Sequence, residues 1–276
     1  MNPSVLRIQP SKGWQVVNLR SLWEFRELLW ILVWRDIKVR YKQTALGAAW
    51  AMLQPLLTMV VFSIFFGKLA GLNAHLPQDI PYPVWTYCAL LPWQLFAYAL
   101  SESGNSLVAN RQLITKVYFP RLVMPLSAVI AGLVDFAIAF VVLLGMLFWY
   151  DIPPSAAVVM LPFFVLFAVA AALAVGLWLS ALNVEYRDVR YTIPFLTQFW
   201  LFLTPIAYPS TLVPAEFRPL YGLNPMAGVV EGFRWALLGT KPPGPLLWVS
   251  LATVTLLLIG GLAYFRRMER TFADIV

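Results

Sequence analysis

Cysteine, histidine and charge are scarce in this sequence. It contains one cysteine, Cys88, and one histidine, His75. A single cysteine cannot form an internal disulfide, and one histidine with no cysteine cluster beside it does not make a metal site. Charged residues make up 12% of the chain, about half the share of an ordinary soluble domain. We therefore expect no metal site, no redox chemistry and no soluble enzyme.

Apolar residues are abundant, at 61% of the chain, and they fall in blocks of about twenty. That is the length an α-helix needs to cross the hydrocarbon core of a bilayer. The sequence therefore predicts an all-α integral membrane protein with one membrane domain, at 46–265. The six predicted spans lie at about 46–69, 84–106, 122–149, 157–181, 191–208 and 246–265.

The basic residues are distributed unevenly about these spans. Eight Lys or Arg precede residue 46, three lie in 105–121, two in 182–190 and three in the tail 266–276. This bias predicts a multi-pass protein of the bacterial inner membrane with both termini in the cytoplasm. Because basic residues flank apolar blocks, we expect the net charge of +7 to face membrane lipids and no nucleic acid. The opposite side carries four basic residues: Lys68, Arg218, Arg234 and Lys241.

The cytoplasmic region 1–45 opens on polar residues without a short apolar core and cleavage site, so we predict no cleaved signal peptide. Within it, 22–43 carries an apolar run from Leu28 to Trp34 between charged flanks. The run is too short to cross a bilayer, and it suits a helix lying in the cytoplasmic interface. Its position before the first span makes it either a lever on that span or only a lipid anchor.

Two further segments are too short to span. The link 104–121 mixes apolar side chains with Arg111 and Lys116, which fits either a docking helix for a cytoplasmic partner or a solvated loop. The outer connection 209–245 contains a well-specified helix. The signals for that helix are Asn224 as N-cap, Pro225 at the first helical position and Gly239 as terminator.

That helix has fourteen residues, which reach about 21 Å and cannot cross the bilayer. Glu231 and Arg234 lie three apart on one face, where they can pair or meet polar cargo. A shorter helix at 215–221 would make a re-entrant hairpin, which is allowed only where protein or water shields it. The alternative is a loop resting on the membrane.

Two carboxyl groups fall within the predicted spans. Asp135 lies near the middle of the third span, where it must be protonated, paired or turned toward protein. A structural hydrogen bond between helices and a functional role both fit Asp135. Glu102 lies near the cytoplasmic end of the second span, where it can reach interfacial water. The sequence supplies no evident partner for a proton relay.

Aromatic and amide side chains recur at helical spacing in the first and fifth spans. Such faces suit sugars, which have apolar C–H faces and polar rims, but they also serve ordinary helix packing. The predicted channel residues are Trp50, Gln54, Thr58 and Phe62 in the first span, and Phe195, Gln198, Phe199 and Phe202 in the fifth.

No GxxxxGK[ST] phosphate-binding loop occurs, and the only Gly-Lys pair, Gly67-Lys68, is followed by Leu69. If ATP drives transport, ATP and Mg²⁺ must therefore bind a separate subunit, and this chain needs no cofactor. A transporter driven by an ion gradient fits the same absence.

Three regions carry a family resemblance that extends from about Leu22 to the end. They are RDIKVRYKQTALGAAWAMLQP from Arg35, KVYFPR from Lys116, and ALNVEYRDVRYTIPF from Ala181 together with LNPMAGVVEGFRWALLG from Leu223. With them the chain closely resembles the permease subunits of ABC-2 type polysaccharide exporters, which serve O-antigen, capsule and teichoic acid export.

The resemblance implies a homodimer that works with two copies of a separate ATP-binding subunit and carries a lipid-linked polysaccharide. It makes 22–43 an interface helix, 104–121 a coupling helix and 209–240 an outer gate, with the first and fifth spans along the channel. This is a transport cycle without a catalytic residue in the chain. The implied ATPase-coupling residues are Arg35, Asp36, Lys38, Arg40, Arg111, Lys116, Tyr118 and Arg121, and the implied gate residues are Asn224, Pro225, Glu231 and Arg234.

Two alternatives remain at this point. An ABC-2 exporter of drugs or lipids would share the fold without the KVYFPR and LNPMAG stretches. A membrane-embedded glycan polymerase or glycosyltransferase would need a convergent set of catalytic side chains, whereas Asp135 and Glu102 lie in different spans at different depths.

Overall fold

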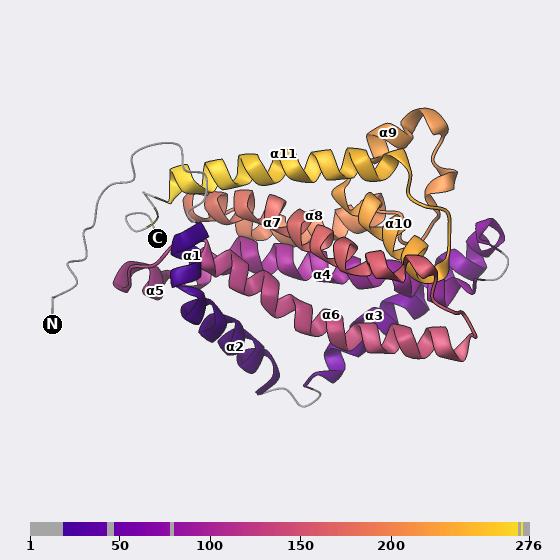
Figure 1. Ribbon diagram of the computed structural model, residues 1–276, viewed down its shortest axis with the longest axis horizontal. Helices are drawn as coiled ribbons and strands as arrows, with labels where there is room; N and C mark the ends of the chain where they lie inside the picture. Colours follow the sequence, from indigo (N-terminus) through magenta and orange to yellow (C-terminus); the bar gives the residue numbers. More distant parts are fainter. Residues whose placement is uncertain (1–18, 43–46, 78–79, 270–271, 273–276) are drawn as a thin grey trace.

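The computed structural model describes residues 19–42, 47–77, 80–269 and 272, and this part of the chain is helical without β-strands. Long helices lie side by side, with α5 at one end of the bundle and α9 at the other (Figure 1). The α-helices are α1 (Leu19–Glu24), α2 (Arg26–Lys42), α3 (Ala49–Phe62), α4 (Tyr82–Ala109), α5 (Arg111–Lys116), α6 (Val123–Trp149), α7 (Leu161–Glu185), α8 (Val189–Leu203), α9 (Arg218–Tyr221), α10 (Pro225–Leu238) and α11 (Pro245–Met268).

Short turns of other helix types connect or extend these elements. The π-helical turn Ser63–Leu69 continues α3, and the 3₁₀ turn Ala156–Met160 leads into α7. The remaining 3₁₀ turns are Leu72–His75, Ser210–Leu212 and Ala215–Phe217. The last of these runs directly into α9, so the shorter helix predicted at 215–221 is present as two consecutive turns.

Four helical segments are long and apolar enough to cross a membrane: Ala49–Leu69, Val123–Trp149, Ala156–Glu185 and Pro245–Met268. They correspond to the first, third, fourth and sixth predicted spans. The second and fifth correspond to α4 and α8. At 15 residues α8 reaches only about 23 Å. At 28 residues α4 is long enough to cross a membrane. Its composition, and not its length, therefore separates it from the four segments named above.

Helix α4 is the centre of the bundle. It packs against α3, α6, α7, α8 and α10, and most of its side chains are buried. Two of its polar groups have partners in these neighbours: the Tyr87 hydroxyl donates to the carbonyl of Ala139 in α6 (3.1 Å), and the Asn183 amide in α7 donates to the carbonyl of Gly104 (2.9 Å). A helix enclosed by protein does not need the wholly apolar surface that lipid demands.

A satellite core joins three cytoplasmic segments predicted from the sequence. Leu32 of α2, Ile114 of α5 and Phe272 of the carboxyl tail are buried in one apolar cluster. The predicted coupling segment 104–121 differs from a single helix, because α4 continues to Ala109 and α5 follows as a separate short helix. Helices α1 and α2 together cover residues 22–42 of the predicted interface helix at 22–43, whose last residue lies outside the described residues.

Helix α10 has the predicted ends and an unexpected degree of burial. The Asn224 side chain accepts from the backbone N–H of Met226 (3.0 Å), Pro225 occupies the first turn, and Gly239 ends the helix at φ 67°. These ends confirm the predicted caps. Most side chains of α10 are buried against α4, α7 and α11. The helix is therefore part of the bundle core.

Gly232 allows α10 to approach α7 closely, which leads to a prediction. A Cβ at this position would lie 2.0 Å from Cε1 of the buried Phe164. We expect Gly232→Ala to destabilise the protein by about 1–3 kcal/mol, because overpacking outweighs a gain of about 1 kcal/mol in helix propensity. Thermal unfolding of the purified protein in detergent measures the effect.

Gly145→Ala in α6 is the matched control, because nothing lies within 4 Å of the added Cβ. Its melting temperature should be unchanged or higher. Equal melting temperatures for Gly232→Ala and the wild type would contradict the proposed close contact.

Candidate functional site

The predicted aromatic face of α8 forms an exposed stripe. The rings of Phe195 and Phe199 stack with centroids 6.2 Å apart and an interplanar angle of 9°. The exposed fractions are 69% for Phe195, 56% for Phe199 and 55% for Phe202, and Gln198 is exposed beside them. This stripe is apolar, lies on one helix face and carries one amide.

The opposite face of α8 fixes the stripe in position. Ile193 is fully buried, and the Trp200 ring packs edge-on against Phe96 of α4 at 5.2 Å. The Trp200 indole N–H donates to Oδ1 of Asn224 (2.9 Å), the residue that caps α10. The aromatic stripe is thus held outward by packing and by a hydrogen bond on its other side.

The predicted face of α3 is divided. Trp50, Gln54 and Thr58 line a cavity of about 520 Å³ whose other walls come from α2, α4 and α6, together with Leu201 of α8. Phe62 instead is buried and packs edge-on against Phe66 at 5.1 Å. None of the four predicted α8 side chains is among the described residues that line this cavity.

Asp135 lies at the wall of this cavity and receives partners from α2. Arg40 forms an ion pair with its carboxylate, and the Tyr41 hydroxyl donates to the same group. The Arg40 guanidinium also lies over the Tyr98 ring of α4, 4.0 Å from the centroid. These contacts fasten the last turn of α2 to α6 and α4.

The Tyr41 hydroxyl is the donor in its hydrogen bond with Asp135. Burial, followed by the hydrogen bond to Asp135, raises the pKa of the Tyr41 phenol well above its ordinary value. Tyr41 therefore stays protonated and remains a donor at physiological pH. Asp135 accepts from a cation and from a neutral hydroxyl, which supplies the partners that a carboxylate within a bundle requires.

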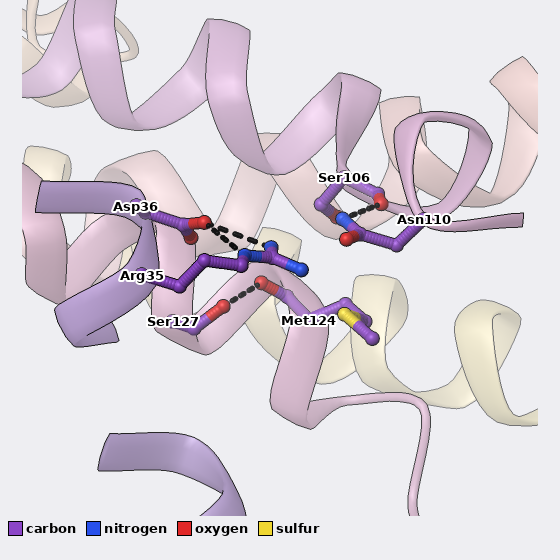
Figure 2. Close-up of polar contacts among 6 residues, drawn as sticks. All are labelled: Arg35, Asp36, Ser106, Asn110, Met124 and Ser127. Carbon is purple, nitrogen blue, oxygen red and sulfur yellow. Dashed lines mark hydrogen bonds and ion pairs between the residues drawn. The ribbon is translucent and has the colours of Figure 1, made fainter. Parts of the chain in front are cut away.

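Charged residues near the middle of α2 contact neighbouring side chains of the same helix. Nε and Nη2 of Arg35 donate to Oδ1 of Asp36, at 2.9 and 2.8 Å, and the Lys38 ammonium lies 5.1 Å from the Trp34 ring centroid. Figure 2 shows the Arg35 guanidinium between two hydrogen-bonded pairs at the end of α4 and the start of α6: Asn110 with Ser106, and Ser127 with Met124.

The segment around α5 presents the predicted coupling residues outward. Arg111, Lys116 and Tyr118 are exposed, whereas Ile114 and Phe119 beneath them are buried in the satellite core. Buried anchors under an exposed polar surface make a fixed platform, in contrast to a solvated loop.

The platform is also tied to the carboxyl-terminal region. The backbone N–H of Arg121 donates to Oε1 of Glu269 (3.0 Å). Phe265 and Phe272 pack edge-on at 5.3 Å within the same apolar cluster.

Arg234 is fully buried in α10. Its Nη1 lies 3.2 Å from Oε1 of Glu231, its Nη2 donates to the carbonyl of Ile206 (2.9 Å), and its guanidinium lies 3.9 Å from the centroid of Trp85. Of the two possibilities for Glu231 and Arg234, the pair is the one observed. Arg234 is therefore a structural cation, a burial that its place in the charge count of the opposite side does not reveal.

Asn224 does more than cap α10. Its Nδ2 donates to the carbonyl of Leu203 and to Oγ1 of Thr204, both at 3.1 Å, while its Oδ1 accepts from Trp200 and from the backbone of Met226. One amide side chain thus joins the end of α8 to the start of α10.

Sequence reasoning missed Tyr41, Tyr98 and Trp85, which complete the two arginine sites. The available signal was the need of Asp135 for a buried partner, but Tyr41 lies 94 residues away in the chain. Among the described residues no group of three or more His, Cys, Asp or Glu side chains is arranged to hold a metal ion.

Known proteins resemble this chain over most of its length. The sequence profile of the ABC-2 type transporter family matches residues 27–238. An O-antigen export system permease protein of Myxococcus xanthus is 31% identical over 262 residues, which cover 94% of this chain and 98% of that protein. A protein with the same description from Klebsiella pneumoniae is 30% identical over 251 residues, 91% of this chain and 95% of that protein. A polysialic acid transport protein of Escherichia coli is 26% identical over 242 residues, 85% of this chain and 91% of that protein.

The Arg40–Asp135 pair predicts a measurable coupling. We expect Asp135→Asn to destabilise the protein by about 1–2 kcal/mol, because it leaves Arg40 without its counter-charge. The value lies below that of a wholly buried pair, because 39% of the Arg40 side chain and 20% of the Asp135 side chain are exposed. Thermal unfolding of Asp135→Asn, Arg40→Gln and the double variant gives the interaction energy.

The double variant should be less destabilised than the sum of the two single variants. Arg20→Ala is the control, because its ion pair with Glu24 is exposed on the surface of α1, and we expect it to be close to neutral. Strict additivity of the two single changes would show that the pair contributes nothing to the attachment of α2.

Proposed function

The chain belongs to the ABC-2 type transporter family, and on that premise we propose that it is the permease subunit of an ATP-driven exporter of a lipid-linked polysaccharide. The observation that carries the proposal is the near full-length similarity to permeases named for O-antigen export and to a protein named for polysialic acid transport. The cargo common to those names is a surface polysaccharide. The exposed aromatic stripe of α8 supplies ring surfaces that suit sugar faces.

We infer that α3, α4, α6, α7, α8 and α11 make six passes of the bacterial inner membrane. The predominance of Lys and Arg beside both termini supports a cytoplasmic location for both ends. In this arrangement α5 faces the cytoplasm and α9 faces outward. Helices α9 and α10 are then a re-entrant outer gate, a role supported by the enclosure of the short α10 within the bundle.

The channel lies between two copies of this chain. Exposed apolar faces of α3 and α8, among them Leu57 and Phe65 of the first span and the α8 stripe, provide the surface for a second subunit and for the passing glycan. In the dimer the two copies of the Phe195–Phe199–Phe202 stripe contribute ring faces from both sides, and Gln198 contributes hydrogen bonds.

Energy comes from two copies of a separate ATP-binding subunit, which hold ATP and Mg²⁺. The surface of α2 and the platform formed by Arg111, Lys116 and Tyr118 are the contacts for this subunit. Closure of the ATPase pair displaces α2, and the attachment of Arg40 and Tyr41 to Asp135 conveys that displacement to α6. This chain changes shape and performs no bond chemistry.

Deletion of the gene tests this function against its alternatives. We expect the deletion strain to lose its surface polysaccharide and to accumulate the lipid-linked polymer in the cytoplasm. Fluorescent lectin or antibody labelling of intact and permeabilised cells separates the two pools, and the restored gene is the control. Loss of the polymer from both pools would indicate a polymerase. An unchanged surface with altered drug tolerance or lipid composition would indicate a drug or lipid exporter.

The aromatic stripe predicts a specific defect. Phe199→Ala combined with Phe202→Ala should lower polysaccharide export severalfold while dimer and ATPase assembly persist, since the rings are exposed and support little of the core. Surface polysaccharide per cell and co-purification of the ATPase measure the two properties. Leu256→Ala with Ile259→Ala is the control, because these exposed side chains belong to α11. Equal export by both double variants would assign the stripe to packing alone.

A further inference from the structure

A second cavity, of about 930 Å³, is lined in part by Arg218 and Tyr221 of α9. Its walls come from the start of α4, the segment that follows α8, the end of α10 and residues 239–245. Its volume lies within the range of small-molecule sites in proteins. It is separate from the cavity beside Asp135, with which it shares no lining residue.

Two polar groups of this wall have no protein partner. Trp85 is 3% exposed, and its indole N–H has no acceptor among the described residues. The Thr240 hydroxyl is likewise buried and without a partner in the described part of the chain. Nearly all buried polar groups in proteins make a hydrogen bond, so these two groups need a partner that the described residues do not supply.

The charges at the cavity favour an anion. Glu231 is neutralised by its ion pair with Arg234, whereas Arg218 and Lys241 remain as exposed cations of the lining, with His75 nearby on the same wall. The Arg218 guanidinium is fixed at the rim, because it donates to the carbonyls of Thr211 and Val213 at 3.2 and 3.1 Å. Among the described residues the lining thus carries two positive charges without a counter-charge.

The rest of the wall offers flat apolar surface. The Tyr221 ring and several proline rings, including Pro209, Pro242 and Pro243, line the cavity. A sugar ring pairs apolar C–H faces with hydroxyl groups along its edge, so it can contact the rings and also accept from Trp85. A hydrocarbon chain would leave the Trp85 N–H and the cations without partners.

We propose that this cavity binds an acidic sugar segment, one carboxylated residue or a few, of the glycan that leaves the channel. The carboxylate pairs with Lys241 and Arg218, a ring oxygen accepts from Trp85, and the prolines contact the sugar faces. The inference rests on the proposed export function and adds an outward binding site in each subunit.

Direct binding tests the site. The permease, purified with its ATPase subunit in nanodiscs, is titrated with tetragalacturonic acid and with the neutral maltotetraose. We expect preferential binding of the acidic probe, weakened by added salt. Lys241→Ser should weaken binding about fivefold, the loss of one charge-assisted contact, and Thr240→Val should weaken it as well. Lys68→Ser is the matched control, because Lys68 is exposed but does not line the cavity.

The outcomes separate this site from the function on which it rests. Absence of binding, equal binding of both probes, or equal effects of Lys241→Ser and Lys68→Ser would overturn the inference. Binding of farnesol without either oligosaccharide would overturn it in favour of a lipid site. If the deletion strain still loses surface polysaccharide in any of these cases, export stands and only the acidic sugar site fails.

Discussion

Polar side chains inside a bundle of apolar helices must find their hydrogen-bond partners within the protein, because hydrocarbon offers none. Asp135 meets this constraint through Arg40 and Tyr41. Arg234 meets it at Nη1 and Nη2, through Glu231 and the carbonyl of Ile206. In each case the solution fastens a helix that is too short or too charged to span, α2 in one and α10 in the other, to the long helices beside it.

Helix α4 joins these two polar sites. Its Tyr98 lies against Arg40, and its Trp85 lies against Arg234. The two aromatic residues are separated by thirteen positions, about 20 Å along the helix axis, and they point to nearly opposite sides. Helix α4 therefore provides an aromatic partner for Arg40 and another for Arg234. This role accounts for part of its departure from a purely apolar composition.

Sequence signals within a few residues predicted the ends of helices well. They could not predict contacts between side chains that are far apart in the chain. The caps of α10 depend on residues within one or two turns, so Asn224, Pro225 and Gly239 identified its ends. The attachment of Asp135 depends on residues 94 positions away, which periodicity cannot reveal. The charge count places Arg234 on the outer side of the membrane, but a count along the sequence cannot show that its helix is enclosed by the bundle.

The two predicted aromatic faces differ for a geometrical reason. With 3.6 residues per turn, each step of four residues rotates the side chain by about 40° around the helix. Three such steps separate Trp50 from Phe62, so the face turns by about 120°, and Phe62 is buried while Trp50 is exposed. On α8 a step of four is followed by one of three, which reverses the rotation, and the stripe from Phe195 to Phe202 stays on one side.

The same packing connects the α5 end of the bundle with its interior. Leu32 of α2, Phe119 after α5 and Phe272 of the carboxyl tail lie in one buried cluster. Because such clusters are closely packed, a displacement of one of these segments displaces the others. Helix α2 continues from that cluster to Asp135, about 18 Å along α6 from its first residue. Helix α2 is thus joined to α6 both by packing and by the ion pair between Arg40 and Asp135. A displacement of α2 therefore reaches α6 through their packed surface and through the ion pair together.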